Sequence, residues 1–419
     1  MVLTAVIIFG FTYLTISAQR LPFLRLDRTS GAMIGAVAMI AFGVLTINDA
    51  YQALNLDTIV LLLGMMIIVA YLQVSGFFEV VARFVLKRAN TGKRLLAAII
   101  ISSGVLSAFL VNDTICVMMT PFVLLLTSRS KVNPKPFLIA LASSANIGSV
   151  ATLVGNPQNM LIGTFSHWPY LEFFVAMLPI AIVGLVIDFF TIRFFFKEAM
   201  NHVLKVKEID SPGSLKPQFK FDRWLLYKSL VVMIVVVIGF SFGARLAFMA
   251  ILGASLLVLL ANKRPDEIFA KVNWSLLLFF ASLFVVVAGI NKVGLVDQAH
   301  KVLEGYFSIS QVKQITTFSF ASLVLSNIVS NVPYVMVVRH WIDSFNSPML
   351  MWLVLAMSST FAGNLTVAGS VANMIVLELS KVRAHFTFWE FAKVSGTIAL
   401  LTWGVGTAIL ILYGVARIF

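Results

Sequence analysis

Two pairs of polar interruptions in otherwise apolar sequence carry most of the chemistry that this chain could perform. The first pair is Val111-Asn112-Asp113-Thr114 and Gly155-Asn156-Pro157-Gln158-Asn159, and the second is Ser330-Asn331-Val332-Pro333 and Gly369-Ser370-Val371-Ala372-Asn373. Asn112 and Asn331 are 219 positions apart, and Asn159 and Asn373 are 214 apart. Near-constant offsets indicate an internal duplication. Polar breaks at matching places in two apolar halves predict a transporter's binding site near the middle of the membrane.

The amides, hydroxyls and glycines at these breaks are the candidate ligands of a small solute. Broken helices expose unpaired N–H and C=O groups, and Asn, Ser and Thr side chains both donate and accept, which suits a hydroxylated or oxyanionic solute. A single Ser or Thr in such a helix is more often a filler that bonds the backbone, but four Asn at paired positions are hard to explain in this way. The candidate set is Asn112, Thr114, Asn156, Asn159, Ser326, Asn331, Thr366, Ser370 and Asn373.

Asp113 is the first candidate for carrying a coupling ion. It follows Asn112 at a predicted helix break, and a carboxylate at membrane depth is costly and usually marks an ion or proton pathway. Removal from water favours its protonated form, so it could exchange a proton. The alternative is a carboxylate that only caps a hairpin arm. No Lys or Arg is predicted at the breaks, which disfavours a multivalent anion as solute.

Two further carboxylates reach into predicted membrane segments. Glu378 lies five residues after Asn373 and close to Lys381; it is the second candidate for ion coupling, with a structural ion pair as the equal alternative. Asp188 is close to Arg193 near the end of its apolar run. We therefore expect a structural ion pair there rather than a proton relay.

The remaining reactive side chains argue against an enzyme and against a metal centre. Cys116 is the only cysteine, so disulfides and a multi-thiolate metal site are excluded; we expect it to be a packing residue, with a soft ligand for a thiophilic solute as the alternative. No nucleophile elbow, zinc-protease or phosphate-loop motif is present, so no cofactor is predicted. The histidines fall in or near predicted loops without metal-ligand spacing: His167, His202, His300, His340 and His385.

A 60% hydrophobic content with 12% charged residues over 419 positions cannot form a soluble surface, so the elements that position these residues must be membrane helices. A span takes about 20 residues, and no cleavable signal is evident in the first run. We predict ten spans near 2–18, 31–47, 57–75, 136–165, 172–192, 225–242, 246–261, 274–291, 349–379 and 394–416.

Two further apolar segments, 95–127 and 312–341, are each broken near the middle. The breaks leave arms of about 13–15 residues, too short to span twice, so we predict two re-entrant hairpins whose tips line a cavity. With the N- and C-termini outside, this layout places 25 of the 31 Lys and Arg on the cytoplasmic side, as the positive-inside rule requires. The net charge of +13 is then topogenic, and nucleic-acid binding is not expected.

The duplication divides the chain into two repeats of inverted topology. The first repeat covers 1–196, with hairpin 95–127 and broken helix 136–165; the second covers 224–419, with hairpin 312–341 and broken helix 349–379. A cytoplasmic linker, 197–223, joins them. Inverted repeats that meet at hairpin tips imply transport by alternating access.

At these residues the chain resembles the ion transporter superfamily, in the branch of ArsB-type arsenite permeases and plant silicon efflux transporters. The resemblance covers essentially the whole chain and is carried by Phe109-Leu110-Val111-Asn112-Asp113-Thr114-Ile115-Cys116 and by the segment from Ser144 to Met160, whose Gly155-Asn156-Pro157-Gln158-Asn159 is especially similar to the silicon exporters. It implies proton-driven export of uncharged metalloid hydroxides, and a scaffold that often dimerises beside a mobile unit containing the hairpins. More distant dicarboxylate relatives carry Ser-Asn-Thr at both tips, where it binds sodium and substrate.

The sequence therefore predicts an all-α secondary transporter in an inner or plasma membrane that exports a small neutral metalloid oxyacid, arsenous or silicic acid, in exchange for protons. Asn112, Asn159, Asn331 and Asn373 would hold the solute, and Asp113 would carry the proton. Sodium-coupled uptake of an inorganic or carboxylate anion is the alternative, with sodium/proton exchange third. The predicted partners are the solute, the bilayer and a second copy of the chain.

Overall fold

The protein is built from helices joined by turns and loops. The computed structural model describes residues 1–18, 26–88, 90–201, 221–298, 300–301, 310–384, 386–416 and 418. In the first half the helices are α1 (Val2–Ala18), α2 (Arg28–Ala41), α3 (Ile47–Ala53), α4 (Leu56–Ser75), α5 (Phe77–Arg88), α6 (Gly92–Phe109), α7 (Asn112–Arg129), α8 (Lys135–Ser149), α9 (Pro157–Ser166), α10 (Tyr170–Phe195) and α11 (Lys197–Asn201).

The second half repeats this order with the same types of break. Its elements are α12 (Arg223–Ser241), α13 (Leu246–Leu260), α14 (Pro265–Phe269), α15 (Trp274–Lys292), α17 (Gln311–Val329), α18 (Asn331–Val338), the 3-10 helix η2 (Arg339–Ser344), α19 (Pro348–Ala362), the 3-10 helix η3 (Val367–Gly369), α20 (Val371–Ser380) and α21 (Phe388–Val415). The predicted all-helical fold is confirmed. Residues 202–220 of the predicted linker lie outside the described residues, and the division into domains stays a prediction.

Local signals confirm that α4 and α15 are counterparts. Asn55 and Asn273, 218 positions apart, each begin a helix by accepting a hydrogen bond from a backbone N–H three residues later, at 2.8 and 3.1 Å. Such caps satisfy N–H groups that the first turn leaves unpaired. Gly76 and Gly294 follow the two helices with φ of +84° and +75°, a left-handed conformation that favours glycine. The duplication is thus visible in the helix ends as well as in the breaks.

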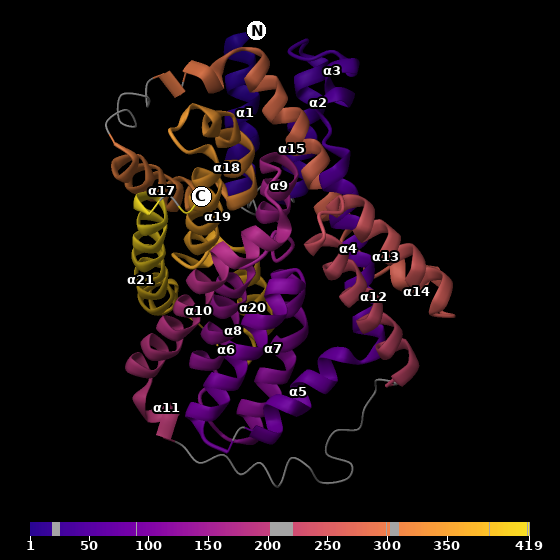
Figure 1. Ribbon diagram of the computed structural model, residues 1–419, viewed down its shortest axis with the longest axis vertical. Helices are drawn as coiled ribbons and strands as arrows, with labels where there is room; N and C mark the ends of the chain where they lie inside the picture. The colour runs from indigo at the N-terminus through magenta and orange to yellow at the C-terminus, as the bar shows by residue number, and fades with distance from the viewer. Residues whose placement is uncertain are drawn as a thin grey trace.

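The two halves exchange their packing partners. α4 of the first half packs against α12 and α13 of the second, and α15 of the second half packs against α1 and α2 of the first. Figure 1 shows α15 beside α1 and α2 in the upper part, and α4 beside α12 and α13 to the right. The broken helices also cross over, since α8 contacts α20 and α9 contacts α19. Neither half can therefore complete its packing alone.

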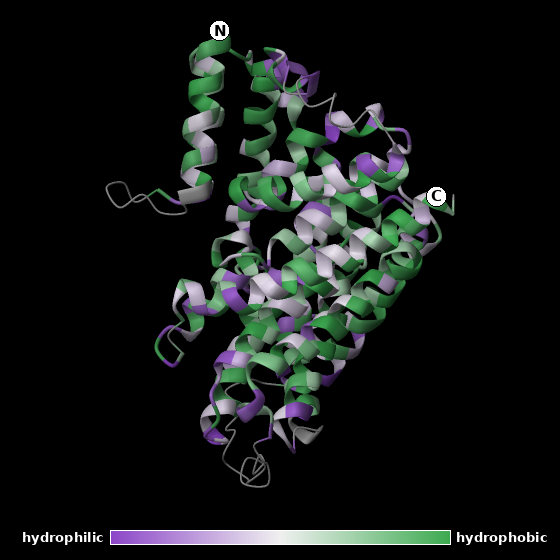
Figure 2. Ribbon diagram, turned by 90° about the vertical axis from the view of Figure 1, so that its left-hand side faces the viewer, coloured by the Kyte–Doolittle hydropathy of each residue, from purple (hydrophilic) through white to green (hydrophobic). Residues whose placement is uncertain are grey.

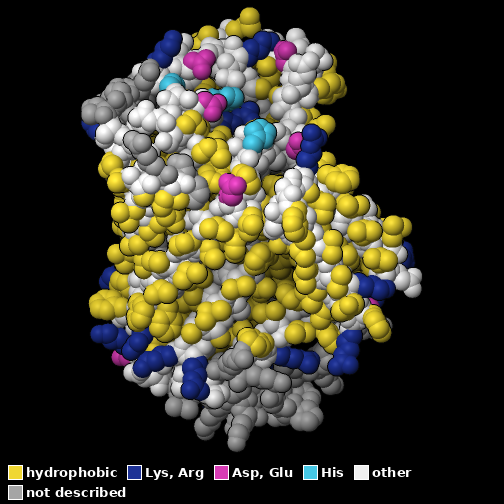
Figure 3. All heavy atoms as spheres, viewed as in Figure 1, with side chains coloured by type: hydrophobic (Ala, Val, Ile, Leu, Met, Phe, Trp, Pro, Cys, Tyr) yellow, Lys and Arg dark blue, Asp and Glu magenta, His cyan; other side chains and the backbone are white. Residues whose placement is uncertain are grey.

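The surface fits a lipid environment. Hydrophobic side chains form a broad band across the face in Figure 3, with Lys and Arg along its lower rim and acidic and His side chains above it. Figure 2, coloured by hydropathy, shows hydrophobic residues in green along most helices. Every predicted apolar run contains a helix. Seven described helices are long and apolar enough to cross a membrane: α4, α6, α10, α12, α15, α17 and α21.

The two predicted hairpins are helix pairs, but three of the four arms are longer than expected and one is shorter. α6, α7 and α17 have 18, 18 and 19 residues, whereas α18 has 8. The predicted arm lengths were wrong because caps at Thr91 and Ser310 start α6 and α17 in polar sequence before the apolar run. By length alone α6 and α17 could cross a membrane, so re-entry from one side stays a prediction.

A glycine contact brings α6 and α8 together. A Cβ atom at Gly148 would lie 2.0 Å from the backbone oxygen of Gly104, so nothing larger than glycine fits at this crossing. Small residues let membrane helices approach closely and gain packing where no hydrophobic effect drives them together. The contact holds α8, which leads into the first break, against the first arm of hairpin one.

We expect Gly148→Ala to lower the melting temperature of the purified protein, because the backbone of α6 must move away. The control is Gly404→Ala in α21, where an added Cβ has no neighbour within 4 Å. Since alanine is a better helix former by about 0.5–1 kcal/mol, the control should keep or raise the melting temperature. Equal melting temperatures for both variants would show that the α6–α8 contact is not tight.

Candidate functional site

Two asparagines hold the two broken segments in the same way. The Asn159 side-chain N–H groups donate to the carbonyl oxygens of Ser149 and Thr152, at 3.2 and 2.9 Å. The Asn373 side chain donates to the carbonyls at the same spacing, ten and seven residues before it, at 2.7 and 3.0 Å. Both asparagines are fully buried. They pair carbonyls that lost their helical partners where α8 and α19 end.

The helices after the breaks begin with capping side chains. Asn156 accepts a hydrogen bond from the backbone N–H of Asn159 at 2.8 Å and so caps α9. Ser370 accepts one from the backbone N–H of Ala372 at 3.2 Å and caps α20. Both caps occupy the matching place in their repeat, 214 positions apart. The backbone of each break is therefore fixed by its own polar side chains.

Asn146, on α8, joins the two halves at the centre of the site. Its side-chain oxygen accepts from Asn112 Nδ2 at 2.9 Å and from Ser370 Oγ at 3.0 Å. Its side-chain nitrogen donates to Asn364 Oδ1 at 2.8 Å and to Asn373 Oδ1 at 3.3 Å. These bonds use both donors and both acceptor sites of the amide. Hairpin one is thereby connected to the break of the second half.

Thr360 provides the reciprocal connection. It lies 214 positions after Asn146, on α19. Its hydroxyl oxygen accepts hydrogen bonds from Asn156 Nδ2 and Gln158 Nε2, both at 3.3 Å. Each half thus supplies a side chain, from the helix before its own break, to the break of the other half. The site has the approximate two-fold relation that an inverted repeat implies.

Hairpin two is held by a smaller set of bonds. Ser326 Oγ donates to Asn331 Oδ1 at 2.8 Å across the tip. Asn327 Nδ2 donates to the Ala362 carbonyl at 2.8 Å, and Thr366 Oγ1 donates to Asn327 Oδ1 at 3.2 Å. At the tip itself, Ser330 has a φ of +74°, outside the region that most residues adopt.

A cavity of about 40 Å³ lies where the two hairpin tips and the two breaks meet. A water needs about 10–15 Å³ by this kind of measure, so the cavity has room for roughly three waters or a solute of a few heavy atoms. Apolar side chains of α15 close one side. The polar lining consists of Arg28, Asn112, Asp113, Gln158, Ser330, Asn331 and Ser370.

Four of the predicted site residues therefore meet at one cavity: Asn112, Asp113, Asn331 and Ser370. The others are not among its lining residues. Thr114 is half-buried on the first turn of α7. The framework of the breaks and of hairpin two contains the rest: Asn156, Asn159, Ser326, Thr366 and Asn373.

Cys116 and Glu378 lie away from the cavity lining. Cys116 is fully buried on α7, one turn after Asn112, among apolar side chains. Glu378 is exposed near the end of α20. The location of Cys116 fits a packing residue rather than a solute ligand.

The expectation that no cation lies at the breaks is wrong. Arg28 begins α2, is half-buried and lines the cavity. Its guanidinium carbon is 5.6 Å from the centre of the Phe279 ring, a favourable cation–π distance, and it interacts electrostatically with Asp113. The sequence placed Arg28 in a cytoplasmic loop because it stands between two apolar runs. In the structure α2 starts beside the hairpin tips.

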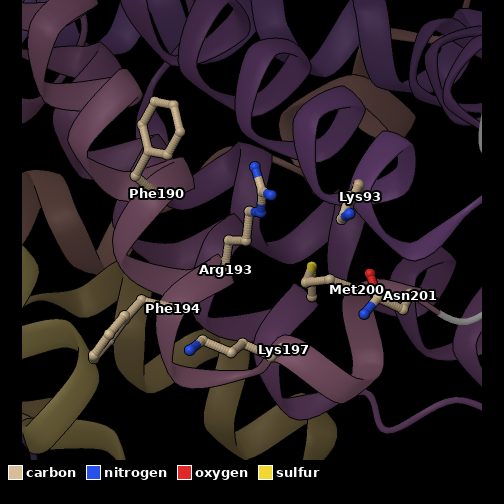
Figure 4. Close-up of a pocket in the computed structure, with 7 residues that line it drawn as sticks. All are labelled: Lys93, Phe190, Arg193, Phe194, Lys197, Met200 and Asn201. Atoms are coloured by element: carbon tan, nitrogen blue, oxygen red, sulfur yellow. The ribbon is translucent and has the colours of Figure 1, made fainter.

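The expected ion pair between Asp188 and Arg193 is also wrong. Asp188 is fully buried on α10, and its Oδ1 lies 2.8 Å from Ser143 Oγ on α8. Arg193, five residues later, instead lines a separate cavity at the end of α10 (Figure 4). Residues five apart do not share a helix face, since neighbours on one face are three or four apart.

Sequence reasoning missed the residues that join the halves. Asn146 and Asn364 are both fully or nearly buried, and they are 218 positions apart. The signal that could have found them was an asparagine in apolar sequence within about ten residues before each recognised break. Gln158 stood inside a recognised break, and its role in the cavity lining could not be separated from that of its neighbours by pattern alone.

Known proteins are similar to this chain in sequence and in fold. Residues 11–347 match the model of the citrate transporter family. The chain belongs to the citrate transporter family. This family member is 31% identical to the silicon efflux transporter LSI3 of rice (Oryza sativa subsp. japonica), over 91% of the chain and 92% of that protein. The predicted membership of the ion transporter superfamily is confirmed, and the protein is a membrane transporter rather than an enzyme.

Other relatives of this citrate transporter family member are similar over most of their length. A 46 kDa membrane protein of Mycobacterium leprae is 28% identical over 93% of both chains. A putative transporter arsB of Dictyostelium discoideum is 27% identical over 93% of this chain and 88% of its own. The crystal structure of the YdaH transporter of Alcanivorax borkumensis has the same fold, with a TM-score of 0.61 and 11% identity over 98% of this chain and 97% of that one.

We expect Asn146→Ala to destabilise the protein strongly. The change leaves Asn112, Asn364 and Asn373 each without one partner, and an unpaired buried polar group costs about 1–3 kcal/mol. The measurement is thermal unfolding in detergent, with Asn346→Ala as control because the Asn346 side chain is exposed. If both variants melted together, Asn146 would not be the connection that the geometry describes.

Proposed function

We propose that the protein exports a small neutral metalloid oxyacid, such as silicic or arsenous acid, in exchange for protons. The observation that carries this proposal is the cavity at the hairpin tips, which combines one carboxylate, one guanidinium and several amides in about 40 Å³. The charges of Asp113 and Arg28 offset each other. The remaining groups donate and accept hydrogen bonds, as a solute bearing several hydroxyls requires.

The size and charge of the cavity favour this class over carboxylate anions. A multivalent anion would have to lose its water in a cavity whose single cation, Arg28, already interacts with Asp113. Burying an uncompensated charge is expensive. A metalloid hydroxide carries no charge and has few heavy atoms. The names of the silicon efflux and arsB relatives support the same class.

Proton exchange follows if the solute and the proton compete for Asp113. Ionised Asp113 can accept a hydrogen bond from a solute hydroxyl, whereas a proton on the same carboxyl removes that acceptor. Each ligand then weakens the other by the same factor, which is the thermodynamic condition for exchange. Asn112 and Asn331, on the two hairpin tips, would hold further hydroxyls, and Ser370 and Gln158 would complete the set.

Sodium-coupled uptake of an anion is the second candidate, because Arg28 lines the cavity. The citrate transporter family model points in the same direction. In that case Arg28 would bind the anion and Asp113 would contribute to a sodium site. Sodium/proton exchange comes third. The coupling ion, the homodimer and the choice of membrane stay predictions.

In everted membrane vesicles carrying a pH gradient, we expect the wild type to accumulate silicic or arsenous acid without sodium. Asp113→Asn should abolish this accumulation, because the amide cannot bind or release the proton. Solute affinity of the wild type should rise as pH rises through the titration of Asp113, up to tenfold per pH unit, and the affinity of Asp113→Asn should not change with pH.

Glu378→Gln is the matched control, because it makes the same chemical change at an exposed carboxylate of α20 and should transport like the wild type. Citrate and phosphate are tested in parallel with and without sodium. Sodium-dependent uptake of either anion by a wild type that accumulates no metalloid in any condition, with Arg28→Gln unable to take up the anion, would replace the export proposal by the second candidate.

A further inference from the structure

A second carboxylate, outside the cavity, lies deep in the helix bundle. Asp188 on α10 is 0% exposed, and its Oδ2 has no hydrogen-bond partner among the described residues. It stands seven residues before the end of α10 at Phe195, about 10 Å along the helix axis. Buried polar groups are nearly always partnered, and a membrane carboxylate without a cation is especially costly as an anion. The function proposed above does not use this side chain.

Among the described residues, no charged side chain from the helices packed around Asp188 interacts with its carboxyl. α10 packs against α6, α8, α11, α12, α19 and α21. Their described charged residues stand near helix ends, and Ser143 is the only side chain that interacts with the Asp188 carboxyl. α19 contributes no charged residue. The charged residues on the other packed helices, with those of α10 itself, are Lys93, Arg94, Lys135, Glu172, Arg193, Lys197, Glu198, Arg223, Lys228, Glu390 and Lys393.

The hydrogen bonds around Ser143 indicate where a proton must be. Ser143 Oγ lies 2.8 Å from the Ile139 carbonyl oxygen and 2.8 Å from Asp188 Oδ1. A hydroxyl has one proton, so it can donate to only one of these two acceptors. When Ser143 donates to Ile139, the contact with Asp188 is a hydrogen bond only if Asp188 supplies the proton. A protonated Asp188 satisfies both short contacts at once, and an ionised one leaves one of them unmade.

We propose that Asp188 is a second proton-binding site, protonated in this conformation, that communicates with the solute cavity through Ser143. On release, the Asp188 O–H bond breaks and the proton passes to water, Asp188 becomes a carboxylate, and the Ser143 hydroxyl turns from Ile139 to Asp188. No other bond forms or breaks. The existence of this site does not depend on the proposed function, although its use in transport rests on it.

A path that alternates hydrogen bonds with the covalent bonds of Ser143, Asn364 and Asn146 connects Asp188 with the cavity. The Ser143 carbonyl accepts from Asn364 Nδ2 at 3.3 Å. Asn364 Oδ1 accepts from Asn146 Nδ2 at 2.8 Å, and Asn146 Oδ1 accepts from Asn112 Nδ2, which lines the cavity. A change of charge at Asp188 would therefore act on α8 and on the same amides that hold hairpin one.

Infrared spectra of the purified wild type and of its variants, compared as differences, test this site without a transport assay. We expect a carbonyl stretch of a protonated carboxylic acid that is present in the wild type and in Asp113→Asn, and absent in Asp188→Asn. Ser143→Ala should shift this band in frequency, because it removes the hydrogen-bond partner of the acid. Ser143→Ala also keeps the test decisive if Asp188→Asn fails to fold.

Glu172→Gln, at the exposed first turn of α10, is the control and should leave the band unchanged. Two results would overturn the proposal. One is an Asp188→Asn spectrum that still contains every protonated-acid band of the wild type, and the other is a Ser143→Ala spectrum in which the band has not moved. If the band behaves as expected but metalloid transport proves independent of protons, the proton site stands and the proposed function fails.

A separate observation concerns the cavity at the end of α10. It has a volume of about 490 Å³ and is lined by Lys93, Arg193 and Lys197, with Phe190 and Phe194 beside them (Figure 4). No acidic residue is among the described residues that line it. Phe190 and Phe194 are 57% and 67% exposed, so their rings can contact lipid chains, and Lys197 Nζ lies 5.2 Å from the centre of the Phe194 ring. Cations beside exposed apolar rings form a site with one charged and one apolar side.

We infer that this cavity binds an anionic phospholipid, whose phosphate contacts Arg193, Lys93 and Lys197 while its chains lie along Phe190 and Phe194. Arg is suited to two-pronged contact with phosphate oxygens, and basic pockets between membrane helices are known to hold anionic headgroups. The cationic rim below the hydrophobic band in Figure 3 is where such headgroups would lie.

Native mass spectrometry and melting curves with phosphatidylglycerol, phosphatidylcholine or inorganic phosphate test this inference. We expect phosphatidylglycerol alone to stay bound and to raise the melting temperature, and Arg193→Gln to weaken its binding at least tenfold. Lys313→Gln, an exposed change on α17, is the control. Equal stabilisation by phosphatidylcholine, or by inorganic phosphate alone, would overturn the anionic lipid assignment, as would unchanged lipid binding in Arg193→Gln.

Discussion

The structure depends on one constraint: backbone groups that lose their helical partners inside a membrane must find others within the protein. Asn159 and Asn373 meet this constraint twice, each pairing two carbonyls at the end of the preceding helix. These hydrogen bonds fix the backbone of each break, so the polar groups of the break occupy defined positions at membrane depth. The cavity exists because four interrupted segments, each stabilised by its own side chains, end at the same place.

The bonds between the halves explain how such a site could be exposed to either side. Asn146 and Thr360 each reach from the helix before one break to the break of the other half. An inverted repeat gives these two connections equivalent positions, and under the transport cycle proposed above, loosening one or the other would give an inward-open or an outward-open arrangement. Arg28 and Asp113 have no such equivalence, and they make the two sides of the cavity chemically different.

The duplication and the breaks could be predicted from sequence because they depend on residue types at fixed spacing. Asn112, Asp113, Asn331 and Ser370 were found in this way and meet at the cavity. The position of Arg28 at the cavity could not be predicted in this way, because a pattern of apolar runs gives the limits of a helix but not the membrane depth at which the helix starts. Asn159 and Asn373 were expected to hold solute, but their amides hold the backbone. Only three-dimensional geometry separates a ligand from a residue that supports one, and the partner of Asp188 was missed for the same reason.

One measurement decides most directly whether the carboxylate at the hairpin tip exchanges a proton for a neutral solute. Purified protein in weakly buffered detergent solution is mixed rapidly with silicic or arsenous acid, and a pH indicator follows the release of protons. The competition at Asp113 predicts proton release that saturates with the solute and is lost in Asp113→Asn. Saturable binding of the solute without any release of protons would contradict the mechanism.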